Sequence, residues 1–308
     1  MWHDLYRKTL LGVADAPFIE SVAKKQGMKI GVSRFVAGET LEEALPALEK
    51  LEQSGLAINL DLLGEFISSE GGAEEMTLQI LDTLERLEKT SLERYMSVKP
   101  TQFGLGLSRD LGLKNAERIL SKAQAVNAHI CLDMENYPYL EPTLWLYQSL
   151  REKGFANVST VLQSYLHRSM SDLKSLLELD LKPTLRIVKG AYRESPEVAF
   201  QDKAKVDASY REMVYAGLDA GAKINIATHD EGLINEIKAY LRGANLSKDH
   251  YEFQLLYGVK LGLQQSLAQE GHKVRIYVPY GKDWYGYFSR RLAERPANLM
   301  FVLRGLTG

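Results

Sequence analysis

Residues 184–227 read TLRIVKGAYRESPEVAFQDKAKVDASYREMVYAGLDAGAKINIA and contain one complete strand–helix–strand unit. The short apolar runs Thr184–Val188 and Lys223–Ala227 predict strands. Between them, Ala199–Ala220 carries apolar residues at helical spacing and predicts an amphipathic helix. Two strands joined by such a helix run parallel in one sheet, so this unit indicates the α/β class.

The same unit recurs along most of the chain. Other apolar runs predict strands at Ala57–Leu62, Arg94–Val98, His129–Leu132, Val158–Leu162, Glu252–Leu256 and Val274–Val278. Amphipathic stretches predict helices at Met76–Leu92, Lys114–Ala125, Thr143–Arg151, Met170–Leu177, Leu233–Leu241 and Leu263–Ala268. Eight such units without a detectable break favour a (β/α)8 TIM-like barrel over an open, doubly wound sheet.

The N-terminal part lacks this rhythm. Residues 1–55 predict a helical segment packed on the barrel, with helices at Pro17–Gln26 and Leu41–Leu51. Thr40 is suited to cap the second helix, because its hydroxyl can accept a bond from a free backbone N–H. Residues 56–308 are expected to form the catalytic barrel.

The bulk composition excludes several classes of protein. The 308 residues carry a net charge of −2 and lack the basic excess of a nucleic-acid binder. A single cysteine, Cys131, allows no intrachain disulfide, which fits a reducing, cytoplasmic location. Residues 1–18 do not resemble a signal peptide, and no apolar run approaches the roughly 18 residues that span a bilayer. Membrane contact is expected to be peripheral at most, on the inner face.

Polar side chains collect where the predicted strands end. Chemistry in a (β/α)8 barrel takes place just past these carboxyl ends. Charges within strands are costly unless they are paired, so Arg186 and Asp133 need partners or a ligand. A ring of such groups indicates a binding site rather than scattered structural residues. The candidate positions are Glu65, Lys99, Asp133–Asn136, Gln163, Arg186, Lys189–Arg193, Thr228–Asp230, Gln254, Leu256, Tyr257, Arg275 and Tyr277.

The last predicted helix, opened by Asp283, adds a basic face. Tyr287, Arg290, Arg291 and Glu294 have helical spacing and share one side of it. One interpretation is a solvated face with an Arg290–Glu294 ion pair. The other is a carboxylate clamp, because guanidinium groups bind carboxylates through two parallel hydrogen bonds.

Other chemistries have weaker support. Gly104-Leu-Gly106 resembles the start of a dinucleotide loop, but Arg109 replaces the third glycine. No His-x-His or His-Glu-x-x-His motif indicates a catalytic metal. Lys189, after the fifth strand, is a candidate Schiff-base lysine of an aldolase. A non-catalytic binding protein would not need the convergent strand-end charges.

Five strings in the correct order resemble the proline dehydrogenase family, specifically its short monofunctional bacterial members. They are LRIVKGAY (185–192), ATHD (227–230), YEFQLLYG (251–258), RIYVP (275–279) and YFSRRLAE (287–294). The resemblance implies a distorted barrel with the last helix over its mouth. It also implies non-covalently bound FAD, oxidation of L-proline to Δ1-pyrroline-5-carboxylate, and a quinone-type electron acceptor.

The resemblance also implies roles for individual residues. Arg186 resembles the arginine beside flavin N5, which favours the negative charge of the reduced flavin. Asp133 resembles the acidic partner of the basic substrate site, and together these two form the expected catalytic pair. The expected substrate-binding residues are Lys99, Tyr277, Tyr287, Arg290, Arg291, Leu256, Tyr192 and the mobile acidic residue Glu65. The expected FAD contacts are Met134, Gln163, Arg186, Val188, Lys189, Gly190, Ala191, Thr228 and His229, with Lys189 presenting its backbone and not its amine.

Overall fold

The computed structural model describes residues 32–64, 67–179 and 182–294. Eight parallel strands close into a barrel in sequence order, with β1 bonded to both β2 and β8. The strands are β1 (Ala57–Leu62), β2 (Tyr95–Val98), β3 (His129–Leu132), β4 (Val158–Gln163), β5 (Thr184–Val188), β6 (Lys223–Ala227), β7 (Tyr251–Leu256) and β8 (Val274–Tyr280). The predicted (β/α)8 fold is therefore confirmed.

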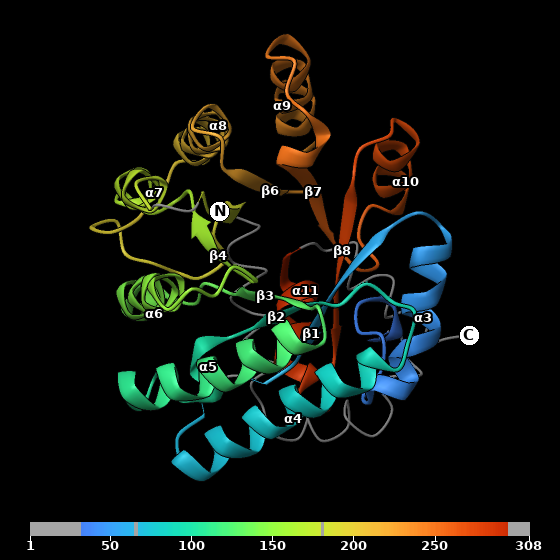
Figure 1. The fold of residues 1–308 in the computed structure, drawn as a ribbon. Coiled ribbons are helices and arrows are strands. Elements are labelled where there is room, and N and C mark those ends of the chain that lie inside the picture. Colours follow the sequence, from blue (N-terminus) through green and yellow to red (C-terminus); the bar gives the residue numbers. More distant parts are fainter. Residues whose placement is uncertain (1–31, 65–66, 180–181, 295–308) are drawn as a thin grey trace.

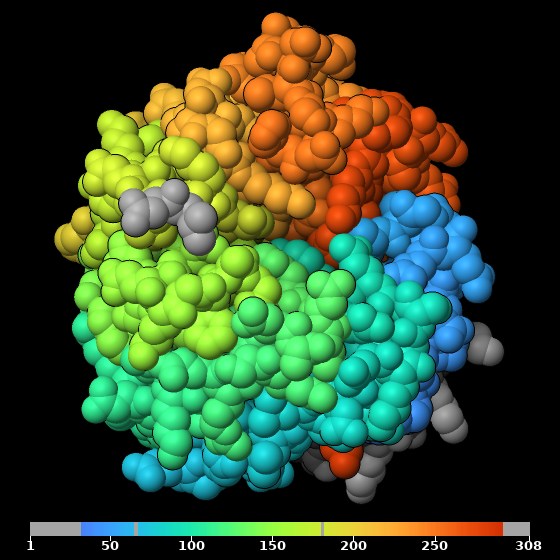
Figure 2. Space-filling view, in the orientation of Figure 1, coloured from blue at the N-terminus to red at the C-terminus, as the bar shows by residue number. Residues whose placement is uncertain are grey.

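Helices surround the barrel in Figure 1 and bury their apolar faces against it. They are α3 (Leu41–Gln53), α4 (Glu70–Glu88), α5 (Arg109–Ala125), α6 (Leu140–Glu152), α7 (Ser169–Leu177), α8 (Lys203–Asp219), α9 (Glu231–Gly243) and α10 (Leu261–Gln269). Short 3-10 turns occur at Val32–Arg34, Pro100–Phe103, Tyr137–Tyr139 and Lys248–His250. Side chains close the centre of the ring in Figure 2, so the barrel is a packed core and not a channel.

The barrel interior is polar along its axis. Side chains alternate between the two faces of a strand, so every second residue points inward. Asn59 Nδ2 donates to Ser97 Oγ over 2.9 Å, and Asn225 Nδ2 donates to Tyr95 OH over 3.2 Å. Asn225 and Tyr95 come from β6 and β2, so their bond spans the interior. These bonds satisfy most of the buried polar groups on the axis, although among the described residues Asn59 Oδ1 and Asn225 Oδ1 have no hydrogen-bond partner.

The helix α3 occupies the place that a helix following β8 would otherwise take. It packs against β1 and β8 between α10 and α4 (Figure 1). Thr40 caps it by accepting from the backbone N–H of Glu43, as predicted. The helix that does follow β8, α11 (Trp284–Glu294), lies instead over the strand ends, where its side chains help to line a cavity.

The segment just before α3 packs against α11. Val32, Phe35 and Val36 form an apolar cluster with Trp284 and other side chains of α11. The Trp284 indole N–H also donates to Glu39 Oε1 over 2.9 Å. This part of the N-terminal segment therefore supports the helix that covers the barrel mouth.

Three predicted helices differ from the structure by four or more residues at an end. The helix expected at Lys114–Ala125 begins at Arg109, where the Ser108 hydroxyl caps it. The other two are α4 and α8. The first was expected at Met76–Leu92 but runs from Glu70 to Glu88, because the Ser69 hydroxyl accepts from Gly72 N–H and starts the helix earlier. The second was expected from Ala199. It begins at Lys203 because Ala199 forms an antiparallel bridge with Leu166 and Asp202 supplies the cap. The helix expected at Pro17–Gln26 lies outside the described residues.

Candidate active site

A cavity of about 830 Å³ opens at the carboxyl ends of the strands beneath α11. Its volume lies in the upper part of the range of about 300–1,000 Å³ that is typical of ligand pockets. The site residues expected from the sequence that line it are Lys99, Asp133, Met134, Gln163, Arg186, Val188, Lys189, Gly190, Ala191, Tyr192, Thr228, His229, Leu256, Tyr277, Tyr287, Arg290 and Arg291. Glu65 lies outside the described residues.

The floor of the cavity holds a charge-balanced cluster. Asp133 accepts from Arg186 Nη1 over 2.6 Å and from Tyr277 OH over 2.5 Å. Lys99 Nζ lies 3.0 Å from Asp61 Oδ1 and 3.8 Å from Asp133 Oδ2. Two carboxylates thus face two cations, which offsets the cost of removing all four charges from water. Burial and the neighbouring Asp133 raise the pKa of Tyr277 well above its ordinary value, so this hydroxyl stays a neutral donor.

Asp61 is a member of the cluster that the sequence interpretation missed. Its side chain is 1% exposed and faces Lys99 inside the barrel. Burial raises the pKa of Asp61, while the nearby Lys99 acts in the opposite direction. The signal was available, because a carboxylate within the predicted strand Ala57–Leu62 requires a partner for the same reason as Arg186.

The helix α11 brings its basic residues to the opposite wall. Tyr287, Arg290 and Arg291 line the cavity, and the Arg291 guanidinium lies 5.2 Å from the centre of the Tyr287 ring. The two arginines are half-buried, so they do not form a fully solvated face. The Glu294 side chain lies outside the described residues, which leaves the Arg290–Glu294 pair a prediction.

The chain after β5 forms a close cradle. Gly190 has φ +113°, and an added Cβ would lie 2.3 Å from Cδ1 of Tyr165, so no other residue fits here. On the neighbouring strand β4, Gln163 Nε2 donates to the Glu135 carbonyl over 3.2 Å. Within the described part of the chain, Gln163 Oε1 is buried without a hydrogen-bond partner. A ligand N–H directed at this oxygen would satisfy it.

Lys189 is engaged by carboxylates at one side of the cavity. Its Nζ lies 2.6 Å from Asp207 and 2.8 Å from Asp230. The hydrogen bond from Lys189 lowers the pKa of Asp230, which also caps α9. A Schiff-base lysine must present its amine to the substrate, whereas these two carboxylates bind the Lys189 amine. This geometry does not favour the aldolase interpretation.

His229 is held in one tautomer. Its Nε2 accepts from the backbone N–H of Leu256 over 2.9 Å, so the ring proton is on Nδ1. In the described ranges no three His, Cys, Asp or Glu side chains cluster as metal ligands would. No helix there is long and apolar enough to cross a membrane.

Comparison with known proteins identifies the family. The model of the family described as proline dehydrogenase matches residues 44–304. The chain is 46% identical to a proline dehydrogenase from Deinococcus radiodurans, over 99% of both chains. The chain belongs to the proline dehydrogenase family. It is also 38% identical to proline dehydrogenase 1 from Bacillus subtilis strain 168, over 98% of this chain and 99% of that one.

Longer proteins that contain a proline dehydrogenase-like barrel are also similar. The structure of proline utilization A from Bdellovibrio bacteriovorus inactivated by N-propargylglycine matches with a TM-score of 0.80 and 25% identity. The match covers 89% of this chain and 33% of that longer protein. The bifunctional protein PutA of Escherichia coli is 26% identical over 96% of this chain, which spans only 25% of it. The monofunctional type is thus the appropriate comparison for a chain of this length.

Proposed function

We propose that this chain is an FAD-dependent proline dehydrogenase that oxidises L-proline to Δ1-pyrroline-5-carboxylate in proline catabolism. The observation that carries the proposal is the combination, in one cavity, of a glycine cradle after β5 and a basic helix across from it. The cradle suits a large planar cofactor, and the basic helix suits a small carboxylate. Membership of the family supports the choice of proline as that carboxylate.

The residues of the cradle fit a flavin. The unpaired acceptor Gln163 Oε1 suits the imide N–H that a flavin ring carries. At Gly190 the backbone itself lines the cavity, with φ +113°, while the Tyr165 ring fills the space that a Cβ would need. Met134, Val188 and Ala191 add apolar wall, while Lys189, Thr228 and His229 surround the part of the cavity near α9. Bound FAD supplies the hydride acceptor for the oxidation.

The substrate side is built from cations and rings. We assign the proline carboxylate to Arg290 and Arg291, with Lys99 contributing from β2. Tyr192, Leu256, Tyr277 and Tyr287 would enclose the pyrrolidine ring and exclude water, which strengthens the electrostatic interactions inside. Glu65 is proposed to pair with the arginines when no substrate is bound.

Arg186 and Asp133 are the proposed catalytic pair. Arg186 places a permanent positive charge at the floor of the cavity, where it favours an increase of negative charge on a neighbouring ring. Asp133 orients that guanidinium and holds Tyr277 OH at the same time. Neither residue is proposed to form a covalent bond with the substrate.

The electron acceptor and location follow from the family likeness alone. We propose a quinone-type acceptor, which an enzyme in the cytoplasm would reach by peripheral contact with the inner face of the membrane. Nothing in the charge balance favours nucleic acid as a partner.

A visible absorption spectrum tests the proposed function. Purified protein should be yellow, and the flavin bands should bleach when L-proline is added without oxygen. D-Proline, whose Cα has the opposite configuration, serves as the control and should bleach the bands much more slowly. A colourless protein that does not take up added FAD contradicts the proposal.

The Tyr277 side chain is expected to set substrate preference. Its hydroxyl is bonded to Asp133 and its ring lies 5.4 Å from the Arg186 guanidinium, so it cannot move aside to admit a 4-hydroxyl group. We expect kcat/KM to favour proline over 4-hydroxyproline by about 10- to 100-fold, the scale on which pockets reject one added hydroxyl. Equal kcat/KM values for the two substrates would show that Tyr277 does not limit the space.

A further inference from the structure

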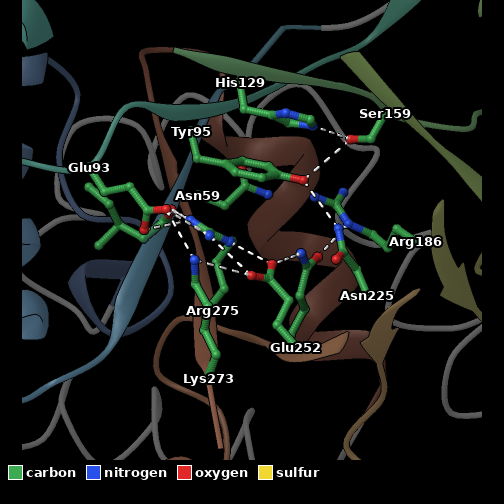
Figure 3. Close-up of polar contacts among 12 residues, drawn as sticks. Asn59, Glu93, Tyr95, His129, Ser159, Arg186, Asn225, Glu252, Lys273 and Arg275 are labelled. Carbon is green, nitrogen blue, oxygen red and sulfur yellow. Dashed lines mark hydrogen bonds and ion pairs between the residues drawn. The ribbon is translucent and has the colours of Figure 1, made fainter. Parts of the chain in front are cut away.

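A chain of buried polar groups runs along the barrel axis from the amino ends of the strands to the cavity. It begins at Glu93, whose side chain is 42% exposed just before β2, and continues through Arg275, Glu252 and Gln254 to Arg186. Figure 3 shows Glu93, Arg275, Glu252 and Arg186 in this order across the barrel. The last four residues are at most 4% exposed. The roles assigned above do not include Glu93, Arg275 or Glu252.

Arg275 follows Glu93 in this series of polar groups, and every N–H of its guanidinium is used in a hydrogen bond. Arg275 Nε and Nη2 donate to the two oxygens of Glu252 over 2.6 and 3.1 Å. Its remaining N–H groups reach Ile58 O and both oxygens of Glu93, over 2.6 to 3.0 Å. Its guanidinium also lies 4.1 Å from the centre of the Tyr95 ring. These bonds fix the Glu252 carboxylate at a defined place inside the barrel.

Glu252 and Arg186 together decide which end of the Gln254 amide faces which neighbour, because Arg186 can only donate. A carboxylate can only accept, so the amide NH2 must point at Glu252, and it does so over 2.6 Å. The amide oxygen is then left to accept from Arg186 Nε, over 2.5 Å. Burial raises the pKa of Glu252, but the charge and hydrogen bonds of Arg275 and its neighbours lower it by more. The pKa therefore lies below its ordinary value, and the carboxylate stays charged.

The three anchors of Arg186 divide into two groups. Asp133 and Ser97 hold Nη1 and Nη2 from the side of β3 and β2. Gln254 alone holds Nε from the side of β7. A guanidinium held only at its two terminal nitrogens can still tilt about the line that joins them, because only the flexible side chain then holds Nε. The Gln254 bond removes that freedom.

We propose that Glu252 is a positioning residue for the reaction: through Gln254, it sets the tilt of the Arg186 guanidinium toward the cofactor cavity. The proposal rests on the proposed function, in which Arg186 lies beside the flavin. Strand alternation makes the arrangement possible, since Glu252 and Gln254 are two residues apart on β7 and point to the same side. A residue near the amino end of β7 thereby influences chemistry at the carboxyl ends of the strands.

The first test compares two matched variants of the holoenzyme. Glu252→Met removes the acceptor for Gln254, whereas Glu93→Met removes a carboxylate from the same Arg275 without touching Gln254. We expect Glu252→Met to slow flavin reduction by proline at least tenfold and to lower the flavin midpoint potential by about 30 mV, the two-electron equivalent of a tenfold change. Glu93→Met should stay within about twofold of the wild-type rate. Equal effects of the two variants, or no effect of Glu252→Met, overturn the proposal.

A second comparison asks whether Glu252 acts through Gln254. Gln254→Leu removes no charge from the barrel interior, so it can replace Glu252→Met as the test if that variant does not fold. It should reproduce the slower reduction and the lower potential. Adding Glu252→Met to Gln254→Leu should change neither value further, because residues that act through one contact are not additive. A wild-type potential in Gln254→Leu, or a further tenfold loss in the double variant, overturns the proposal.

A measurement without flavin separates this inference from the proposed function. In protein labelled with 15N-arginine, the Arg186 Nε–H should exchange slowly with solvent, its signal being identified by its loss in Arg186→Lys. Exchange should be at least tenfold faster in Glu252→Met and unchanged in Glu93→Met. A protein that binds no flavin but shows this pattern contradicts only the proposed function. Equal exchange in both variants contradicts the positioning role.

Discussion

Replacement of Arg290 or Arg291 by alanine is expected to lower kcat/KM for L-proline by about 10- to 100-fold. Proline offers few groups to recognise, so binding must depend on its carboxylate. Both arginines line the cavity from α11, and adjacent helical positions differ by about 100°, which long side chains can bridge to reach one anion. A lost charge-assisted hydrogen bond costs roughly 1.5–3 kcal/mol, which corresponds to this range.

Steady-state kinetics measures the effect and locates it. Most of the loss should appear in KM if the arginines bind the ground state and transition state alike. Flavin content should stay near that of the wild type, because the change is on the substrate side. Arg109→Ala is a suitable control, since this arginine is 48% exposed and pairs with Glu141 on the outer helices. Wild-type KM values in both α11 variants would instead favour a solvated arginine face with a small stability contribution.

Replacement of Asp133 by alanine is expected to reduce both stability and turnover. The change removes the acceptor for Arg186 Nη1 and Tyr277 OH, and it takes away one of the carboxylates beside Lys99. Breaking a buried ion pair by removal of one partner costs about 3–5 kcal/mol, because the other charge stays buried. The free energy of unfolding in urea should fall by this amount, and kcat should fall because Arg186 loses an anchor.

Two further variants interpret that result. Asp133→Asn keeps the shape and one acceptor oxygen, so its losses should lie between those of the wild type and Asp133→Ala. Asp110→Ala removes an exposed carboxylate from the first turn of α5 and should cost less than about 1 kcal/mol. If Asp133→Ala unfolds at the same urea concentration as Asp110→Ala, then the floor cluster is not a source of stability.

Much of the barrel could be predicted from local patterns. The bounds of β1, β3, β5 and β6 agree with the expected apolar runs, and the other strands differ by one or two residues at an end. Strands of a parallel barrel are buried by the helices outside them, so their sequences are short apolar runs with clear ends. Helix bounds were less predictable, because caps such as Ser69 and the Leu166–Ala199 bridge depend on backbone geometry.

The candidate site was predictable to the extent that it follows the strand-end rule. That rule led to Lys99, Asp133 and Arg186, and the structure places all three on one cavity. It did not lead to Asp61 or to Glu252, although both are charged residues within strands, as Arg186 is. Whether such a residue points at the cavity, at the axis or at a helix depends on strand alternation and on the register between strands.

The sequence by itself determined the number and order of the strand–helix units, and hence the closed barrel and the end at which its polar groups gather. These properties depend on hydrophobic periodicity, which each segment carries locally. Only the tertiary structure decided that α3 takes the outer position beside β8 while α11 lies over the mouth. Only it decided which of the buried charges meet. A buried charge is stable only beside its partner, and here the partner can lie 182 residues away in the sequence, as with Arg275 and Glu93.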